Sequence, residues 1–206
     1  QYNKMFQALL CKFFAKVFYP TNSKDWYKSK EYRGADNNAK FADFILTQRR
    51  KGALFYNEFL SVQLTRQYIL SGDNQLDSVL VIPNQDISEG KAGSRLYFIM
   101  FYGKGEYYES RFRDMARQAK ETGASVLGFN HKGVHSSSGK ISCLAELVND
   151  GIAVVDFLLQ RGVSHEQIIL QGNSLGAGVQ AMVSEHYRAI NGVPLRQINS
   201  NSFKSL

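Results

Sequence analysis

Residues 170–178, LQGNSLGAG, hold a serine between two glycines and continue into further small residues. The apolar residues just before this stretch predict a buried strand, and residues 175–190 predict an amphipathic helix. The stretch therefore predicts a strand that turns sharply into a helix, with Ser174 at the turn. Gly172 and Gly176 supply the backbone room that such a crowded turn needs.

A serine in this setting is suited to nucleophilic attack. In a G-x-S-x-G turn between strand and helix, the hydroxyl stands clear of the sheet. The start of the following helix offers backbone N–H groups and a positive dipole end to a developing oxyanion. We expect the N–H of Leu175 to be one such donor. A packing turn without catalysis is the alternative interpretation, which the motif alone does not exclude.

Strands and helices alternate on both sides of this turn. Residues 61–70 and 76–83 predict two strands joined by the turn GDNQ, which favours a hairpin. From residue 94 the pattern is strand, helix, strand, helix, strand, helix, strand, at 95–102, 106–123, 124–130, 141–162, 167–172, 175–190 and 193–203. Such alternation indicates an α/β fold with a doubly wound, mostly parallel sheet.

Residues 61–206 resemble the α/β-hydrolase superfamily of serine esterases, lipases and thioesterases, and match the N-terminal part of that fold. The first anchor is GNSLG, and the second is the segment FIMFYGKGEYYES, where a buried strand ends in a glycine turn. The resemblance implies that Gly103 belongs to the turn and that the N–H of Lys104 is the second oxyanion donor. Tyr102 stands where the family has histidine. Because the family's donor at this turn is a backbone group, the resemblance still implies an oxyanion hole here. A third likeness is the loop GFNHKGVHSSSG, in which His131 and Lys132 depart from the family pattern.

The usual partners of a catalytic serine are not identifiable in this chain. The family order is serine, then acid, then histidine. After Ser174 the sequence offers only Glu185 and His186, which we expect on the surface of the following helix. His131 and His135 fall in a loop at the carboxyl edge of the sheet, and we expect them to line the cleft. A non-standard pair of Ser174 with one of these histidines is the alternative. We call the strand-to-helix turn that carries Ser174 the elbow. A doubly wound sheet rarely stops one strand past such a turn, so we expect the core to be truncated, with the acid and histidine beyond residue 206.

Two functions follow from these residues. The first is a serine hydrolase that cleaves an ester or thioester of a small-molecule or lipid acyl substrate, with Ser174 as nucleophile and an acyl-enzyme intermediate. This chemistry needs no metal and no organic cofactor, and Cys11 and Cys143 match no metal-ligand spacing. The alternative is a catalytically inactive binding or effector protein on the same scaffold.

Residues 1–60 form a basic segment with 11 Lys and Arg against 5 Asp and Glu, whereas residues 61–206 are nearly neutral with 14 against 13. Helices are predicted at 4–19 and 35–50. The apolar stretch 5–20 is too short for a membrane span and is interrupted by two lysines. It is compatible with contact to a membrane surface or with packing on the sheet. No nucleic-acid-binding motif accompanies the charge, so we expect no nucleic-acid partner.

Overall fold

The computed structural model describes residues 61–84 and 95–201. Within them the chain begins with an antiparallel hairpin of β1 (Val62–Ser71) and β2 (Asn74–Pro83). The turn between the strands uses Gly72 at φ 59°, a backbone conformation that glycine adopts without steric penalty. The predicted hairpin is therefore confirmed, with a tighter turn than the sequence indicated.

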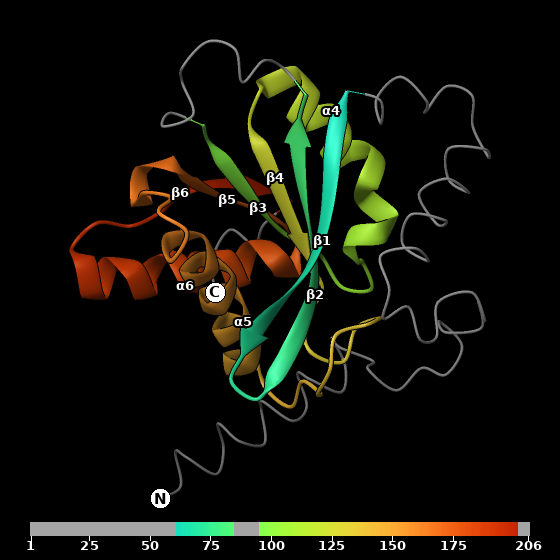
Figure 1. Cartoon of the computed structure of the whole chain (residues 1–206). Helices are drawn as coiled ribbons and strands as arrows, with labels where there is room; N and C mark the ends of the chain where they lie inside the picture. Colours follow the sequence, from blue (N-terminus) through green and yellow to red (C-terminus); the bar gives the residue numbers. More distant parts are fainter. Residues whose placement is uncertain (1–60, 85–94, 202–206) are drawn as a thin grey trace, which may run out of the picture.

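The remaining strands alternate with helices as the sequence predicts. In chain order they are β3 (Tyr97–Phe101), α4 (Phe112–Thr122), β4 (Ser125–Phe129), α5 (Leu144–Leu159), β5 (Ile168–Asn173), α6 (Leu175–Asn191) and β6 (Arg196–Ser200). Together with the hairpin, these strands form a six-stranded sheet of order β1-β2-β4-β3-β5-β6 (Figure 1). Within it β4, β3, β5 and β6 run parallel to one another. The doubly wound, mostly parallel α/β fold is confirmed.

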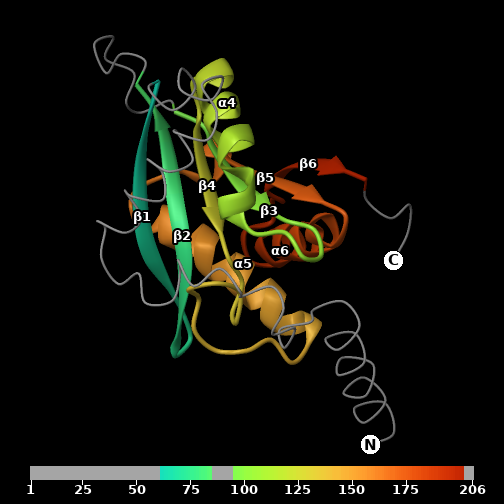
Figure 2. The same cartoon turned by 90° about the vertical axis from the view of Figure 1, so that its right-hand side faces the viewer.

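The two faces of the sheet are covered by different helices. Val126 of β4 packs in a cluster with Met115 and Ala116 of α4. Its neighbour Leu127 packs on the opposite face, in a larger cluster that includes residues of α5 and α6. Successive side chains of a strand point to opposite faces, so the central strands are buried on both sides. Figure 2 shows α4 on one side of the sheet and α5 with α6 on the other.

Two helices start later than the sequence pattern suggests. The segment expected to be helical from residue 106 first forms a turn, Gly103–Glu106, then a short 3-10 helix, Tyr108–Arg111, and only then α4. The segment expected from residue 141 begins as α5 at Leu144. The carboxylate of Glu146 accepts the backbone N–H of Ser142 and of Cys143 and so caps the helix start.

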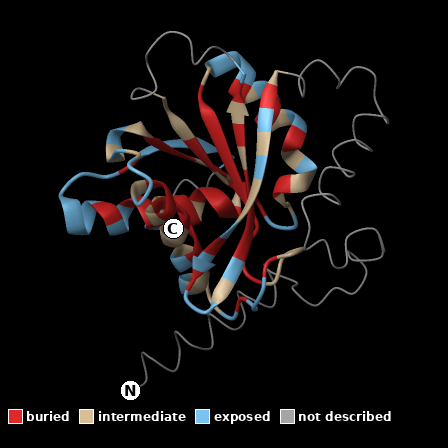
Figure 3. Cartoon of the chain, in the orientation of Figure 1, coloured by how far each residue is buried: buried red, intermediate tan, exposed pale blue. Residues whose placement is uncertain are grey.

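The central strands of the sheet are covered, whereas the outer strand β6 is not. The central strands β4, β3 and β5 are largely buried, whereas every residue of β6 is exposed (Figure 3).

The carboxyl ends of β3, β4, β5 and β6 lie at one edge of the sheet because these strands are parallel. The loops that carry the predicted site residues therefore meet at that edge.

The helices predicted at 4–19 and 35–50, and the stretch 5–20 with its predicted membrane contact, lie outside the described residues. Among residues 61–84 and 95–201, no helix combines the length and apolar character that crossing a membrane requires.

Candidate active site at the carboxyl edge of the sheet

Ser174 occupies a strained turn between β5 and α6. Its backbone has φ 51° and ψ −119°, outside the regions that residues with a side chain ordinarily adopt. The Ser174 N–H donates to the carbonyl of Ser200 at 3.1 Å, and its carbonyl accepts the N–H of Ala177 at 3.0 Å. The sharp strand-to-helix turn predicted from the sequence is present, and its surroundings hold a non-glycine residue in a costly conformation.

The two motif glycines allow the elbow to close. A Cβ on Gly172 would lie 2.6 Å from the Cα of Ala177, and a Cβ on Gly176 would lie 2.2 Å from the carbonyl oxygen of Phe101. Real Cβ atoms do not approach backbone this closely. Gly172 therefore lets β5 fold back against the first turn of α6. Gly176 lets that helix rest on the end of β3, which brings the elbow beside the turn after β3.

Leu175 is the first residue of α6, and its side chain is buried. The first N–H groups of a helix have no partner within the helix, and they carry the positive end of its dipole. The position is therefore suited to the oxyanion-donor role expected for the Leu175 N–H.

The turn after β3 lies at the same edge of the sheet. Tyr102 is buried, and its hydroxyl lies 3.1 Å from the Sδ of Met115, so its side chain points toward α4. Gly103 is buried, whereas Lys104 is exposed at the corner of the turn. The Tyr102 side chain, at the position where the family has histidine, therefore makes a packing contact with α4.

Glu106 connects this turn to the elbow, which sequence analysis did not foresee. Its Oε2 accepts the N–H of Gly103 at 2.8 Å and the side-chain Nδ2 of Asn173 at 3.3 Å. Its Oε1 forms an ion pair with Arg111. The only sequence signal was an acid three residues after a turn glycine, which is too common to single out.

His131 is buried in a polar network around Asp150, which we call the Asp150 hub and which also includes Ser71 and Lys132. Its Nδ1 lies 3.2 Å from Oδ2 of Asp150, which also accepts the backbone N–H of Lys132 at 3.0 Å. The other carboxylate oxygen accepts the hydroxyl of Ser71 at 2.8 Å and pairs with the Lys132 ammonium at 3.1 Å. Burial by itself raises the pKa of Asp150, but the His131, Lys132 and Ser71 contacts outweigh it and lower that pKa below its ordinary value. The hub ties β1, the loop after β4 and α5 together.

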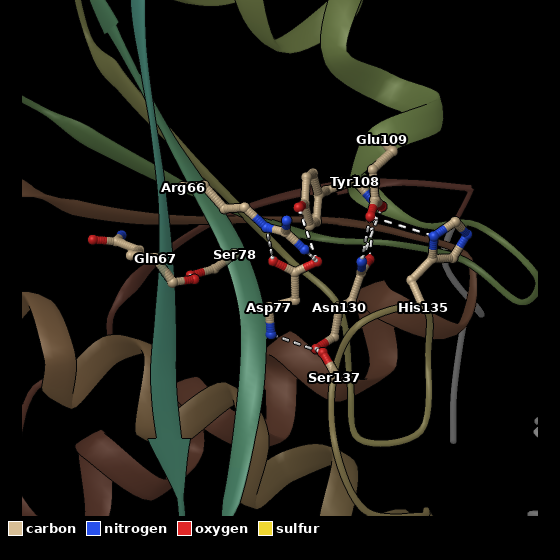
Figure 4. A network of polar contacts seen from close by, with 9 residues as sticks. All are labelled: Arg66, Gln67, Asp77, Ser78, Tyr108, Glu109, Asn130, His135 and Ser137. Carbon is tan, nitrogen blue, oxygen red and sulfur yellow. Dashed lines mark hydrogen bonds and ion pairs between the residues drawn. The ribbon is translucent and has the colours of Figure 1, made fainter. Parts of the chain in front are cut away.

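A second buried network lies on the α4 face of the sheet (Figure 4). Asp77 of β2 is fully buried and accepts two hydrogen bonds from the guanidinium of Arg66, at 2.7 and 2.9 Å. The hydroxyl of Tyr108 donates to the same carboxylate at 3.0 Å, and the hydroxyl of Ser137 accepts the Asp77 N–H at 2.8 Å. A buried charge is tolerated only when paired in this way.

His135 joins this network through Glu109. Its Nδ1 lies 3.4 Å from Oε1 of Glu109, and its ring packs on Tyr107 with centroids 4.2 Å apart. Both oxygens of Glu109 accept the side-chain Nδ2 of Asn130, at 3.1 and 2.9 Å. Burial raises the pKa of Glu109 to about 8, against the opposing effect of the Asn130 hydrogen bond. Burial also lowers the pKa of His135.

The other two histidines lie away from the elbow. His165 precedes β5, at the opposite edge of the sheet, and packs near the ring of Tyr187. His186 is exposed on α6, as is Glu185, which pairs with Arg188. His186 and Glu185 are therefore the surface residues that the sequence predicted. The structure brings Ser174, Leu175 and the Gly103–Lys104 turn together, and it places His131 and His135 in the neighbouring loop.

A groove of about 710 Å³ lies between the end of the hairpin and α5. Its lining is mixed, with apolar Tyr68, Leu70, Ile152 and Phe157 beside charged Lys132 and Arg161. Sequence analysis gave no sign of it, because its walls come from segments about 80 positions apart.

No group of histidines, cysteines and carboxylates in the described part of the chain is arranged to hold a metal ion.

Comparison with solved structures identifies the fold. The chain superimposes on a bacterial heroin esterase with a TM-score of 0.55 and 20% identity, covering 79% of this chain and 53% of that one. For vibralactone cyclase the TM-score is 0.54 at 12% identity, covering 89% and 57%. For an α/β-hydrolase from Vibrio vulnificus it is 0.53 at 19% identity, covering 70% and 46%. At these identities the likeness shows the fold alone, and the chain spans about half the length of these proteins.

No curated protein matches the sequence. The sequence model of the family described as Chlamydia CHLPS protein (DUF818) matches residues 75–192, more than half of the chain. That match spans β2 to the end of α6 and so includes the elbow and the turn after β3. The chain therefore belongs to the Chlamydia CHLPS protein (DUF818) family and has the α/β-hydrolase fold.

Proposed function

We propose that this chain carries the nucleophile and the oxyanion donors of a serine hydrolase that cleaves an ester or thioester. The observation that carries the proposal is the backbone of Ser174, a non-glycine residue at φ 51° and ψ −119° between a buried strand and a helix start. Strain of this kind persists only where the surroundings enforce it, and it clusters at functional sites. The close approach of Gly176 to Phe101, which sets the elbow beside the turn after β3, adds support.

The reaction would proceed through an acyl-enzyme. The Ser174 hydroxyl loses its proton to a base as its oxygen attacks the carbonyl carbon. The oxyanion accepts hydrogen bonds from the backbone N–H groups of Lys104 and Leu175. The tetrahedral intermediate collapses, the alcohol or thiol leaves with a proton, and water then releases the acid by the same route in reverse. The steps use no metal and no organic cofactor.

We assign no base. His131 and His135 lie in the loop after β4 at the same edge of the sheet, and we propose them as residues that line the cleft. Their contacts with Asp150 and Glu109 bind each ring to a different network. A substrate with a small-molecule or lipid acyl group fits the chemistry proposed for the elbow.

The test is labelling by a fluorophosphonate, which reacts covalently with an activated serine. The longest natural form of the protein is compared with its Ser174→Ala variant and with the 206-residue chain. Labelling that disappears in Ser174→Ala supports the proposal. Absence of labelling in the longest form refutes it. Labelling of the longest form but not of the 206-residue chain would place the base outside these residues.

A binding or effector protein on a hydrolase scaffold is the second candidate. The observations that favour it are the burial of His131 in a structural hub and the turn of Tyr102 toward Met115. An unlabelled longest form that remains folded would select this function.

Contact with a membrane surface through residues 5–20 is a separate proposal that rests on sequence alone. Sedimentation with liposomes of the intact protein and of a version without residues 1–20 tests it. Equal binding by the two forms would refute a role for the segment.

A further inference from the structure

We propose that Glu106 is a positioning residue that holds the turn after β3, and with it the Lys104 N–H, against the nucleophile elbow. The inference rests on the proposed function and adds a residue to that site. It is carried by a set of contacts that Glu106 makes with the turn, with the elbow and with the start of the following helix.

Glu106 closes its own turn from both sides. Its backbone N–H donates to the carbonyl of Gly103 at 3.2 Å, and its carboxylate accepts the N–H of Gly103 at 2.8 Å. Lys104 and Gly105 are the two corner residues between them, and Gly105 has φ 75°, which favours glycine at that corner. The backbone of Lys104 is therefore fixed by hydrogen bonds on either side of it.

The same carboxylate reaches the elbow. Asn173, the residue before Ser174, donates its side-chain Nδ2 to Oε2 of Glu106 at 3.3 Å. Its Oδ1 in turn accepts the side-chain Nδ2 of Asn201 at 3.3 Å. A Cβ on Gly103 would lie 3.1 Å from Oε2 of Glu106, so glycine permits this close approach. Glu106 thus links the two segments that carry the proposed oxyanion donors.

Arg111 sets the direction of the carboxylate. It pairs with Oε1 of Glu106, which leaves Oε2 for Gly103 and Asn173. The Arg111 side chain is 41% exposed and that of Glu106 is 21% exposed. Ion pairs at this exposure add little to stability. Removing the carboxylate is therefore expected to move the turn more than it weakens the fold.

An oxyanion donor acts only within a narrow range of distance. Removing one such donor lowers kcat by about a hundredfold or more. Loosening the turn displaces the donor without removing it, so we expect a smaller loss of about tenfold. The loss should fall on kcat, because the donor acts on charge that develops in the transition state.

The kinetic test uses the longest natural form with Glu106→Ala, Glu106→Gln and a matched control, Glu121→Ala. Glu121 is an exposed acid near the end of α4. With p-nitrophenyl butyrate, Glu106→Ala should lower kcat about tenfold and leave KM within about twofold. Glu106→Gln keeps an accepting oxygen and should recover most of the loss, whereas Glu121→Ala should match the wild type. Unchanged kcat in Glu106→Ala, or equal losses in the alanine and glutamine variants, would overturn the inference.

A second measurement does not depend on catalysis. Amide hydrogen exchange of peptides covering residues 101–108 should be at least about tenfold faster at Gly103 in Glu106→Ala, because its N–H loses its acceptor. Glu121→Ala should leave that exchange unchanged. Unchanged exchange in Glu106→Ala overturns the positioning role, whereas an unlabelled wild type overturns the proposed function. The two failures are therefore distinguishable.

Discussion

Replacement of Ser174 by glycine should stabilise the protein while abolishing its proposed reactivity. The backbone at Ser174, with φ 51° and ψ −119°, is one that glycine adopts far more readily than residues with a Cβ. Such strain is worth about 1–3 kcal/mol. Glycine also gives the unfolded chain more freedom, which offsets about 0.4–1 kcal/mol of the gain. The net expectation is a stabilisation of about 1 kcal/mol.

Thermal unfolding and denaturant titration provide the assay. A gain of about 1 kcal/mol raises Tm by about 2–4 °C in a chain of this size. Ser174→Ala removes the hydroxyl but keeps a Cβ in the same backbone conformation, so its Tm should stay near that of the wild type. Both variants should lose fluorophosphonate labelling.

A control substitution at ordinary backbone separates strain relief from a general effect of glycine. Ser110 is exposed in the short 3-10 helix, and its hydroxyl donates to the carbonyl of Tyr107 at 2.7 Å. Ser110→Gly should therefore lower stability rather than raise it. If Ser174→Gly is no more stable than Ser174→Ala, the strain at Ser174 does not exceed the entropic offset of about 0.4–1 kcal/mol, and the main support for a catalytic Ser174 is lost.

Three further predictions concern packing and buried charge. Gly176→Ala should lower the free energy of unfolding by about 3 kcal/mol or more, because its Cβ would lie 2.2 Å from the Phe101 carbonyl oxygen. Denaturant titration measures this change, and a smaller loss of stability would contradict the close packing. Burial raises the pKa of Glu109 to about 8, so the folded protein retains a proton that the unfolded chain releases from about pH 4.5. Stability from this group falls as pH rises from 4.5 to 8, and Glu109→Gln should be more stable than the wild type at pH 9 but not at pH 5. Asp150→Asn leaves the Lys132 ammonium without its counter-charge and should destabilise the protein by about 3 kcal/mol at pH 7. Because the pKa of Asp150 is lowered below 3.8, the stability that its ionised carboxylate contributes is present above about pH 4 and is lost in acid. In urea titrations the free energies of unfolding of the wild type and of Asp150→Asn should therefore converge at acidic pH.

The local features of this protein were determined by its sequence. The hairpin, the alternation of strands and helices and the elbow at Ser174 all follow from periodicity and from glycines a few positions apart. These signals are short in range because strand and helix periods and turn preferences act over neighbouring residues. The family resemblance rested on the same short segments, and the fold it implied is the one observed.

The polar network around the site was decided only by the tertiary structure. The hydroxyl of Ser71 meets Asp150 across 79 positions, and Asn173 meets Glu106 across 67. Buried acids such as Asp77 and Asp150 are indistinguishable in sequence from exposed ones, because charged residues are buried only where partners arrive from elsewhere in the chain. Those partners are brought together by the strand order β1-β2-β4-β3-β5-β6. No local pattern encodes that order, since it results from burying both faces of one sheet at the same time.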